Sequence, residues 1–536
     1  MDSNVSQIFP LTEMQKGMLF HSVMEPNSGI YCEQFMFQID GSLDVDRFER
    51  AWQGVVNEND ILRISTCFKG VREPVQAVHK EVSHSVSLVD LSDNPDAFLS
   101  RLDQLLISDR HRGFRFDQPE LIRAALVKRT NDQHILLLTY HHLILDAWSL
   151  FLLMKELVEH YDTGGSIAKV NPFYSDYVKS LRSSERVQSD DFWKSYLTGY
   201  GSVTHVADAQ SNSAVSRNSL ETHLEIVHHV SATLSARLLD CSRRTGLTLN
   251  TLIQGAWGLT VAGASGDDDV VFGITITHRP HHIASIDKMV GIFINSLPKR
   301  IRISRDQTIA DYLTAIQSDQ ANIKRHEQVA LPDIQRLSDI PGGQPIFQTL
   351  LIFENFLKSP AWQQSRDLSI RHFRYVGWTN YPMAIEAMPP ADDKPLFFQV
   401  KFDTNYFSAK RVQELLINME GFLEVIAARP DDKVSDLVSV SARAVASTAV
   451  RRPTEQSEDI GGAYHSEIAD IWKRIIGLEQ FDSRLSFFEA GGHSLLLFQL
   501  QAELRTQYGV DIELVDLFDS PTVALQAQRV EALLAS

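Results

Sequence analysis

Up to about residue 440, short β-rich runs alternate irregularly with segments in which apolar residues recur every three or four positions. The β-rich runs predict strands at 123–127, 135–140, 270–276, 297–303, 347–353 and 396–402. Helical spacing of apolar residues predicts helices over 48–57, 149–161 and 409–427. The turn residues at 130–132 predict a hairpin between the first two strands. No repeat period is present, so the pattern indicates a mixed α/β body.

The composition changes at residues 441–463, where Ala, Ser, Thr, Arg, Pro and Gly dominate and aromatic residues are absent. We expect a linker there, between a body at 1–440 and a small domain at 464–536. In the small domain, five apolar residues at helical spacing are followed by Gly477 as a helix stop. They are Ile468, Ile471, Trp472, Ile475 and Ile476. Further helical segments over 497–508, 516–518 and 523–534 predict an all-α domain of four helices.

Charge and cysteine content narrow the classes of partner. The chain has 51 Lys and Arg against 68 Asp and Glu, a net charge of −17 without a basic stripe, so we expect no nucleic-acid partner. No apolar run approaches the roughly 18–20 residues that span a bilayer, so no membrane association is expected. Cys32, Cys67 and Cys241 form no CxxC motif, and the N-terminus lacks the pattern of a secretion signal. These features favour a reducing, cytoplasmic location.

The sharpest local signal is the segment FFEAGGHSL at 487–495. Two glycines allow a tight turn that leaves Ser494 in the first turn of a helix, where free N–H groups favour a phosphate. An ordinary N-cap serine is the alternative interpretation. The segment closely resembles the phosphopantetheine attachment motif of peptidyl carrier proteins. That resemblance, which covers the whole small domain, implies that Ser494 carries a covalent 4′-phosphopantetheine arm, and no metal is implied.

A second signal is HHLILDAWS at 141–149, where a β-rich run delivers two adjacent histidines into a loop. Neighbouring side chains of an extended backbone face opposite sides, so only one histidine can point into a given cleft. An imidazole near its ordinary pKa can accept a proton or donate a hydrogen bond at neutral pH. Histidine pairs alone are weak signals, and two more pairs, at 228–229 and 281–282, are interpreted as surface residues.

The body resembles, from end to end, the condensation domains of non-ribosomal peptide synthetases. Seven segments match their motifs in order: PLTEMQKGMLFH at 10–21, DILR at 60–63, HHLILD at 141–146, FGITITHRP at 272–280, VGIFINS at 290–296, HEQVAL at 326–331 and PIF at 345–347. The family implies two lobes like chloramphenicol acetyltransferase, here about 1–178 and 179–440, with the active-site motif in a tunnel between them. Carrier arms enter that tunnel from its two ends.

Carried over to this chain, the resemblance implies that His142 is the catalytic histidine and that His141 and Asp146 hold the loop. Arg63 is expected to support the site as the charge partner of Asp146, with an ordinary surface arginine as the alternative. Three residues depart from the family pattern: Ala147 and His278 replace glycine, and Asn59 replaces histidine. The methyl group of Ala147 would cause strain only if the backbone there had a positive φ.

The expected reaction is amide formation between a donor thioester and an acceptor amine, with His142 acting either as a base or as a hydrogen-bond donor. The chain contains no adenylation motif, so its arm would be loaded by a separate adenylation enzyme, or the chain is a fragment of a larger synthetase. The expected partners are that enzyme, an upstream donor carrier and a phosphopantetheinyl transferase.

Other interpretations stay open. A plant-type CoA-dependent acyltransferase would share His142 and Asp146, but its DFGWG motif is absent. A glycerolipid acyltransferase would use His141 and Asp146, but no membrane-binding segment supports it. The body could also be a non-catalytic platform that recruits tailoring enzymes, or an acyltransferase that forms esters or accepts free amines.

Overall fold

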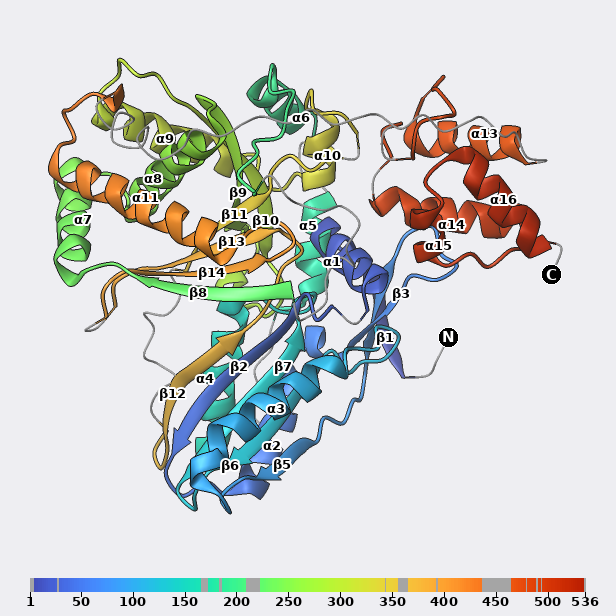
Figure 1. The fold of residues 1–536 in the computed structure, drawn as a ribbon. Helices are drawn as coiled ribbons and strands as arrows, with labels where there is room; N and C mark the ends of the chain where they lie inside the picture. Colours follow the sequence, from blue (N-terminus) through green and yellow to red (C-terminus); the bar gives the residue numbers. More distant parts are fainter. Residues whose placement is uncertain are drawn as a thin grey trace.

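The computed structural model describes residues 4–26, 28–164, 172–182, 186–208, 222–342, 344–354, 365–391, 394–435, 464–478, 480–487, 490–492 and 494–534. Within these ranges, the side chains of 182–188, 494–495, 515 and 518–519 are outside the description. The linker expected at 441–463 also lies outside the described residues. Figure 1 shows two sheet-containing lobes, with a group of helices from the C-terminal part beside them.

The first lobe is built on a five-stranded sheet in the order β12-β2-β7-β6-β5. Its strands are β12 (Ser369–Val376), β2 (Cys32–Asp40), β7 (Gln133–His141), β6 (Ile122–Lys128) and β5 (Val86–Asp90). β6 and β7 pair antiparallel, which confirms the predicted hairpin. Helix α3 (Phe98–His111) buries its apolar residues on one face, and α2 (Val45–Glu58) and α4 (Ala147–Thr163) pack on the other.

The second lobe has a six-stranded sheet in the order β10-β9-β11-β13-β14-β8. Its strands are β10 (Ile294–Arg302), β9 (Asp269–Thr277), β11 (Thr349–Phe353), β13 (Met383–Met388), β14 (Phe397–Asp403) and β8 (His223–His229). Its main helices are α7 (Ala232–Thr245), α8 (Leu249–Ser265), α9 (Ile309–Lys324) and α11 (Ala409–Ala428). Thirteen residues of α8 are buried, as expected for a helix packed on several sides.

Strand β12 connects the two lobes, because it comes from the second half of the chain and pairs with β2 of the first lobe. The lobes expected at about 1–178 and 179–440 therefore share a sheet (Figure 1). The short helices α5 (Tyr174–Arg182), α6 (Arg186–Leu197) and α10 (Leu331–Arg336) lie in the connecting segments. The pairing of β12 with β2 joins the two lobes next to the segment that follows β7.

A third, three-stranded sheet pairs β1 (Val5–Pro10), β4 (Val75–His79) and β3 (Ile64–Cys67). Helix α1 (Glu13–Met24) follows β1 and starts with a capping box, in which Thr12 accepts from the N–H of Gln15 and Gln15 accepts from the N–H of Thr12. This sheet and α1 form the part of the first lobe nearest to the C-terminal helices (Figure 1).

The C-terminal helices are α13 (His465–Ile476), α14 (Ser494–Tyr508), α15 (Leu514–Asp519) and α16 (Val523–Leu534), which confirms the predicted all-α domain. Gly477 has a φ of 81° and ends α13 in the left-handed conformation expected of a helix stop. Trp472 is fully buried and donates from its indole N–H to Gln526 of α16, at 2.9 Å. Among the described residues, no helix is long and apolar enough to cross a membrane.

Candidate active site

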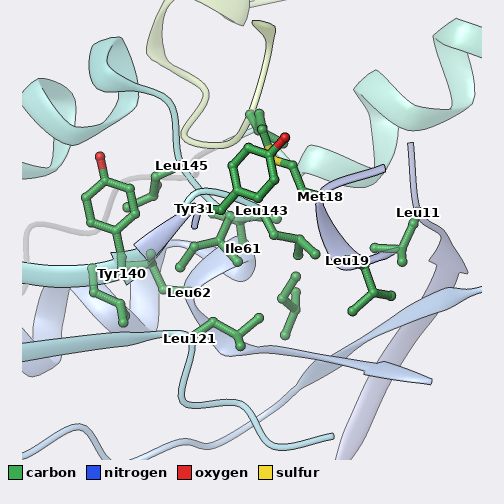
Figure 2. Close-up of a cluster of buried hydrophobic side chains, with 14 of the residues drawn as sticks. Leu11, Met18, Leu19, Tyr31, Ile61, Leu62, Leu121, Tyr140, Leu143 and Leu145 are labelled. Atoms are coloured by element: carbon green, nitrogen blue, oxygen red, sulfur yellow. The ribbon is translucent and has the colours of Figure 1, made fainter. Parts of the chain in front are cut away.

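The segment between β7 and α4 is held in the core of the first lobe. Its three central residues, Leu143, Ile144 and Leu145, are fully buried. Figure 2 shows Leu143 and Leu145 in a cluster with Ile61 and Leu62. These buried residues anchor the segment, and the polar residues His142 and Asp146 lie at its two ends.

His141 has a structural environment. Its Nδ1 accepts from the N–H of Leu143 at 3.1 Å, so Nε2 carries the proton and donates to Ser22 Oγ at 2.9 Å. The ring meets those of Phe114 and Phe116 edge-on. Burial lowers the pKa of His141 to about 3, so this imidazole is neutral at physiological pH.

His142 has a different environment. Its backbone N–H donates to the carbonyl of Tyr31 at 2.8 Å, while its side chain is only half-buried. Nδ1 is buried, and no described residue forms a hydrogen bond with it. Tyr31 has a φ of 58°, which is uncommon for a residue with a side chain, and its N–H donates to the carbonyl of Trp378. The backbone at His142 is thus tied to the segment that follows β12.

Asp146 connects the first lobe to the second. One carboxylate oxygen caps α4 by accepting from the N–H of Ser149 at 2.8 Å, and the other accepts from the N–H of Phe293 at 3.0 Å. The N–H of Asp146 donates to the carbonyl of Gly291 at 3.1 Å. The guanidinium of Arg279 lies 3.6 Å from the carboxylate and donates to Ser149 Oγ. The third, fourth and fifth motifs therefore meet at this carboxylate.

The expected ion pair between Arg63 and Asp146 is wrong. Arg63 instead donates to the backbone carbonyls of Val56, His79 and Lys80. The carboxylate that interacts electrostatically with its guanidinium is that of Asp60. Arg63 therefore ties α2 to β4 within the first lobe. Arg279, within the fourth motif and packed on the ring of Phe293, is the charge partner of Asp146 that was expected in Arg63.

Two of the three departures from the family pattern are accommodated by local structure. Asn59 is buried at the end of α2, where its side-chain amide donates to Val55 O and to Glu156. Ala147 is the first residue of α4 and is not among the described residues with positive φ, so its methyl group causes no backbone strain.

A cavity of about 1040 Å³ lies between α1, the second lobe and the helical domain. His21 and Tyr31 line it from the first lobe, and His278 and Asn295 line it from the second. Residues 490–492, just before Ser494, line the same cavity. Through Tyr31 and Ile292, its wall is continuous with the groups that hold His142 and Asp146.

The turn before Ser494 needs both of its glycines. Gly491 has a φ of 100°, and a Cβ on Gly492 would lie 2.5 Å from the ring of Phe487. Helix α14 begins at Ser494, whose side chain lies outside the described part of the chain. A helix N-terminus on a small-residue turn beside a large cavity fits a phosphate-linked arm. This segment has the features that phosphopantetheine requires.

The helical domain contacts the first lobe through α14 and α15. The ring of Phe498 lies edge-on to those of Phe20 and Phe68, with centroids 6.3 and 6.4 Å away. Two ion pairs lie at the margin: Lys69 Nζ is 2.9 Å from Glu513, and Arg72 is 3.1 Å from Glu503. This contact sets the Ser494 turn against the cavity.

The family comparison agrees with this geometry. Residues 5–447 match the condensation domain family, and residues 466–530 match the phosphopantetheine attachment site family. The chain is 32% identical over 448 residues to a linear gramicidin synthase of Brevibacillus parabrevis and 30% identical over 448 residues to bacitracin synthase 3 of Bacillus licheniformis. These matches cover 82% of this chain but only 6% and 7% of those proteins, respectively.

Solved structures support the predicted fold. A four-domain non-ribosomal peptide synthetase, holo-AB3403, superposes with a TM-score of 0.69 at 18% identity, covering 81% of this chain and 34% of that one. The X-domain from teicoplanin biosynthesis gives 0.68 at 20% identity, covering 81% of this chain and 98% of that one. The two-lobed condensation fold with a helical carrier domain is thereby confirmed. The chain belongs to the condensation domain family of non-ribosomal peptide synthetases and joins that domain to a phosphopantetheine-binding carrier domain.

Proposed function

We propose that this chain forms an amide bond between a donor acyl group, delivered as a thioester by another carrier, and an acceptor amine presented by its own carrier domain. The observation that carries this proposal is that residues 490–492 line the same cavity as both lobes of the condensation domain. The attachment segment therefore opens toward the tunnel from the α1 side. We assign this side to the acceptor and expect the joined product to remain on Ser494.

In this proposal Ser494 bears the arm. When bound, phosphopantetheine supplies the thiol on which the acceptor is held. Its phosphate would be received by the N-terminus of α14, which follows the turn at Gly491 and Gly492. A phosphopantetheinyl transferase is therefore a required partner.

His142 is the residue proposed to act on the reacting groups. Thioester aminolysis requires a neutral amine, a fixed carbonyl and stabilisation of the oxyanion that develops. The half-buried imidazole of His142, with its backbone fixed by Tyr31, can hydrogen-bond to the attacking amine or to that oxyanion. His141 and Asp146 are proposed to hold the loop. Confining both reactants in one cavity would supply much of the rate.

The acceptor amino acid would come from a separate adenylation enzyme. The condensation match ends at residue 447 and the carrier match begins at 466, so no adenylation domain separates them. We place this reaction in the cytoplasm, where the thiol of the arm and Cys32, Cys67 and Cys241 stay reduced.

The location of the product tests the proposal. The chain, loaded with an amino acid on Ser494, is mixed with a separate carrier that bears a panel of donor thioesters, and both carriers are measured by intact-mass spectrometry. We expect the donor mass to be added to the chain and the donor carrier to be returned as free thiol. Ser494→Ala, which cannot be loaded, should give no product on the chain. Joined product on the separate carrier would show that the polarity is reversed.

A further inference from the structure

His278, the third departure from the family pattern, lies in the wall of the acceptor cavity. It follows β9 directly, and its N–H donates to the carbonyl of Phe293 at 2.7 Å. Its ring packs beside Tyr177, with centroids 6.0 Å apart. Both His278 and Glu327 line the cavity that Gly491 and Gly492 also line. This places an extra imidazole on the route of the incoming acceptor.

A carboxylate fixes the tautomer of His278. Nδ1 lies 2.6 Å from Glu327 Oε1, and since a carboxylate can only accept, Nδ1 carries the proton. Nε2 of the neutral ring then bears a lone pair, and no described residue forms a hydrogen bond with it. The His278 side chain is 19% exposed and that of Glu327 is 5% exposed, so the carboxylate is shielded while the imidazole reaches the cavity.

His142 and His278 differ in whether a carboxylate lies against Nδ1. His142 has no carboxylate on Nδ1 among the described residues, whereas His278 has one. An imidazole backed by a carboxylate is stabilised when it becomes an imidazolium. His278 therefore has a carboxylate placed to stabilise an added proton, and His142 is left to position the reacting groups.

Other charged groups around His278 weaken, but do not cancel, the stabilisation of its protonated ring by Glu327. Lys324 Nζ lies 2.9 Å from the second oxygen of Glu327 and donates to the carbonyl of Thr277. Arg279, the next residue, is directed to Asp146 and Ser149. Tyr177 contributes a phenol whose pKa is raised by burial, so it stays neutral. Glu13, Glu73, Asp333 and Arg336 also line the cavity.

We propose that the His278–Glu327 pair accepts the proton of the acceptor ammonium as it enters the cavity. This inference rests on the proposed function. The ammonium transfers one proton to Nε2 of His278, and the neutral amine attacks the donor thioester. The C–N bond forms as the C–S bond breaks, a second amine proton goes to the departing thiolate, and His278 returns its proton to solvent. No oxidant or further reactant is needed.

The expected effect follows from the acidity of the acceptor. An α-amine with a pKa of about 7.7–8.0 is roughly one-tenth to one-sixth neutral at pH 7 and mostly neutral at pH 9. His278→Gly, which introduces the residue usual in the family, should therefore slow single-turnover condensation about tenfold at pH 7. Its rate should come within about twofold of the wild-type rate at pH 9.

The experiment uses the full chain, with the acceptor installed on Ser494 from a CoA conjugate by a phosphopantetheinyl transferase. A glycyl acceptor is compared with an aminooxyacetyl acceptor, whose nitrogen is already neutral at pH 7. His278→Gly and His278→Gln should be slow only with the glycyl acceptor and only near pH 7. His326→Gln removes a neighbouring histidine held by Ser189 and stacked on Phe192, so it should keep the wild-type profile.

An equal loss with both acceptors, or no loss with the glycyl acceptor at pH 7, would overturn the proposal. Failure of the proposed function is distinguishable, because the wild type would then give no product on Ser494 with either acceptor. A readout that does not depend on turnover is modification of Nε2 by diethyl pyrocarbonate, mapped by peptide mass. His278 should be protected by a stable amide-linked glycyl arm and not by an acetyl arm. Equal protection by the two arms would contradict binding of the amine at His278.

Discussion

At the residue scale, the loop proposed as the active site contains two side chains with hydrogen-bond partners and one, His142, that we assign to the chemistry. The His141 ring is hydrogen-bonded to Leu143 and Ser22. The Asp146 carboxylate is hydrogen-bonded to Ser149 and Phe293. The His142 side chain has no partner among the described residues. A side chain that stabilises the fold has its polar atoms satisfied, and one that acts on substrate keeps them available. This contrast yields separable effects of mutation.

We expect His142→Ala to lower the condensation rate by about 10²–10⁴-fold with little change in stability, because its imidazole pairs with no described residue. Asp146→Ala should instead lower the free energy of unfolding by about 3–5 kcal/mol, since it leaves two backbone N–H groups without their acceptor and the largely buried Arg279 guanidinium without its carboxylate. Urea midpoints and single-turnover rates measured on both variants check this. Equal destabilisation by the two substitutions would contradict the division of roles.

His141 predicts a dependence of stability on pH. Its pKa is about 3 in the fold and about 6.5 in the unfolded chain, so between these values the unfolded state binds the extra proton. Stability contributed by the neutral ring is complete above pH 6.5 and is lost as the pH falls toward 3, at up to about 1.4 kcal/mol per pH unit. Urea midpoints from pH 7 to 4 should fall more steeply for the wild type than for His141→Gln. Identical slopes would show that His141 is not held neutral.

At the element scale, the spacing of apolar residues along the chain was sufficient to predict individual strands and helices. The predicted strands at 123–127 and 135–140 lie within β6 and β7, and the helix that Gly477 was expected to end stops there. The pairing of β12 with β2 could not be read from the sequence, because partners more than 300 residues apart leave no local signal. The same limit applies to Asp146, whose charge partner depends on how the lobes meet.

The contact of α15 with the first lobe gives a prediction at this scale. Lys69 and Glu513 are both more than half exposed, so their ion pair is worth at most about 1 kcal/mol. Lys69→Glu should place two carboxylates together and slow transfer to Ser494 by up to about fivefold at low salt. Adding Glu513→Lys should restore the rate. A double variant as slow as the single one would show that this pair does not guide the carrier domain.

At the scale of the whole molecule, the first lobe and the carrier domain share a continuous apolar core through Phe20, Phe68 and Phe498. The carrier domain thus lines the cavity beside α1 with its attachment turn. Sequence motifs identified both domains, but not this contact, since surface complementarity is distributed over residues without a common pattern.

The central claim, that the arm on Ser494 enters the tunnel from the α1 side, is tested most directly by disulfide trapping. In a Cys67→Ser background, Asn295→Cys places a thiol in the cavity wall, and Leu99→Cys places one on the 59% exposed outer side of α3. After mild oxidation of the arm-bearing chain, peptide mass spectrometry should find the arm joined to residue 295 and not to residue 99, at a yield independent of protein concentration. Equal trapping at both positions, or trapping only between molecules, would contradict the account.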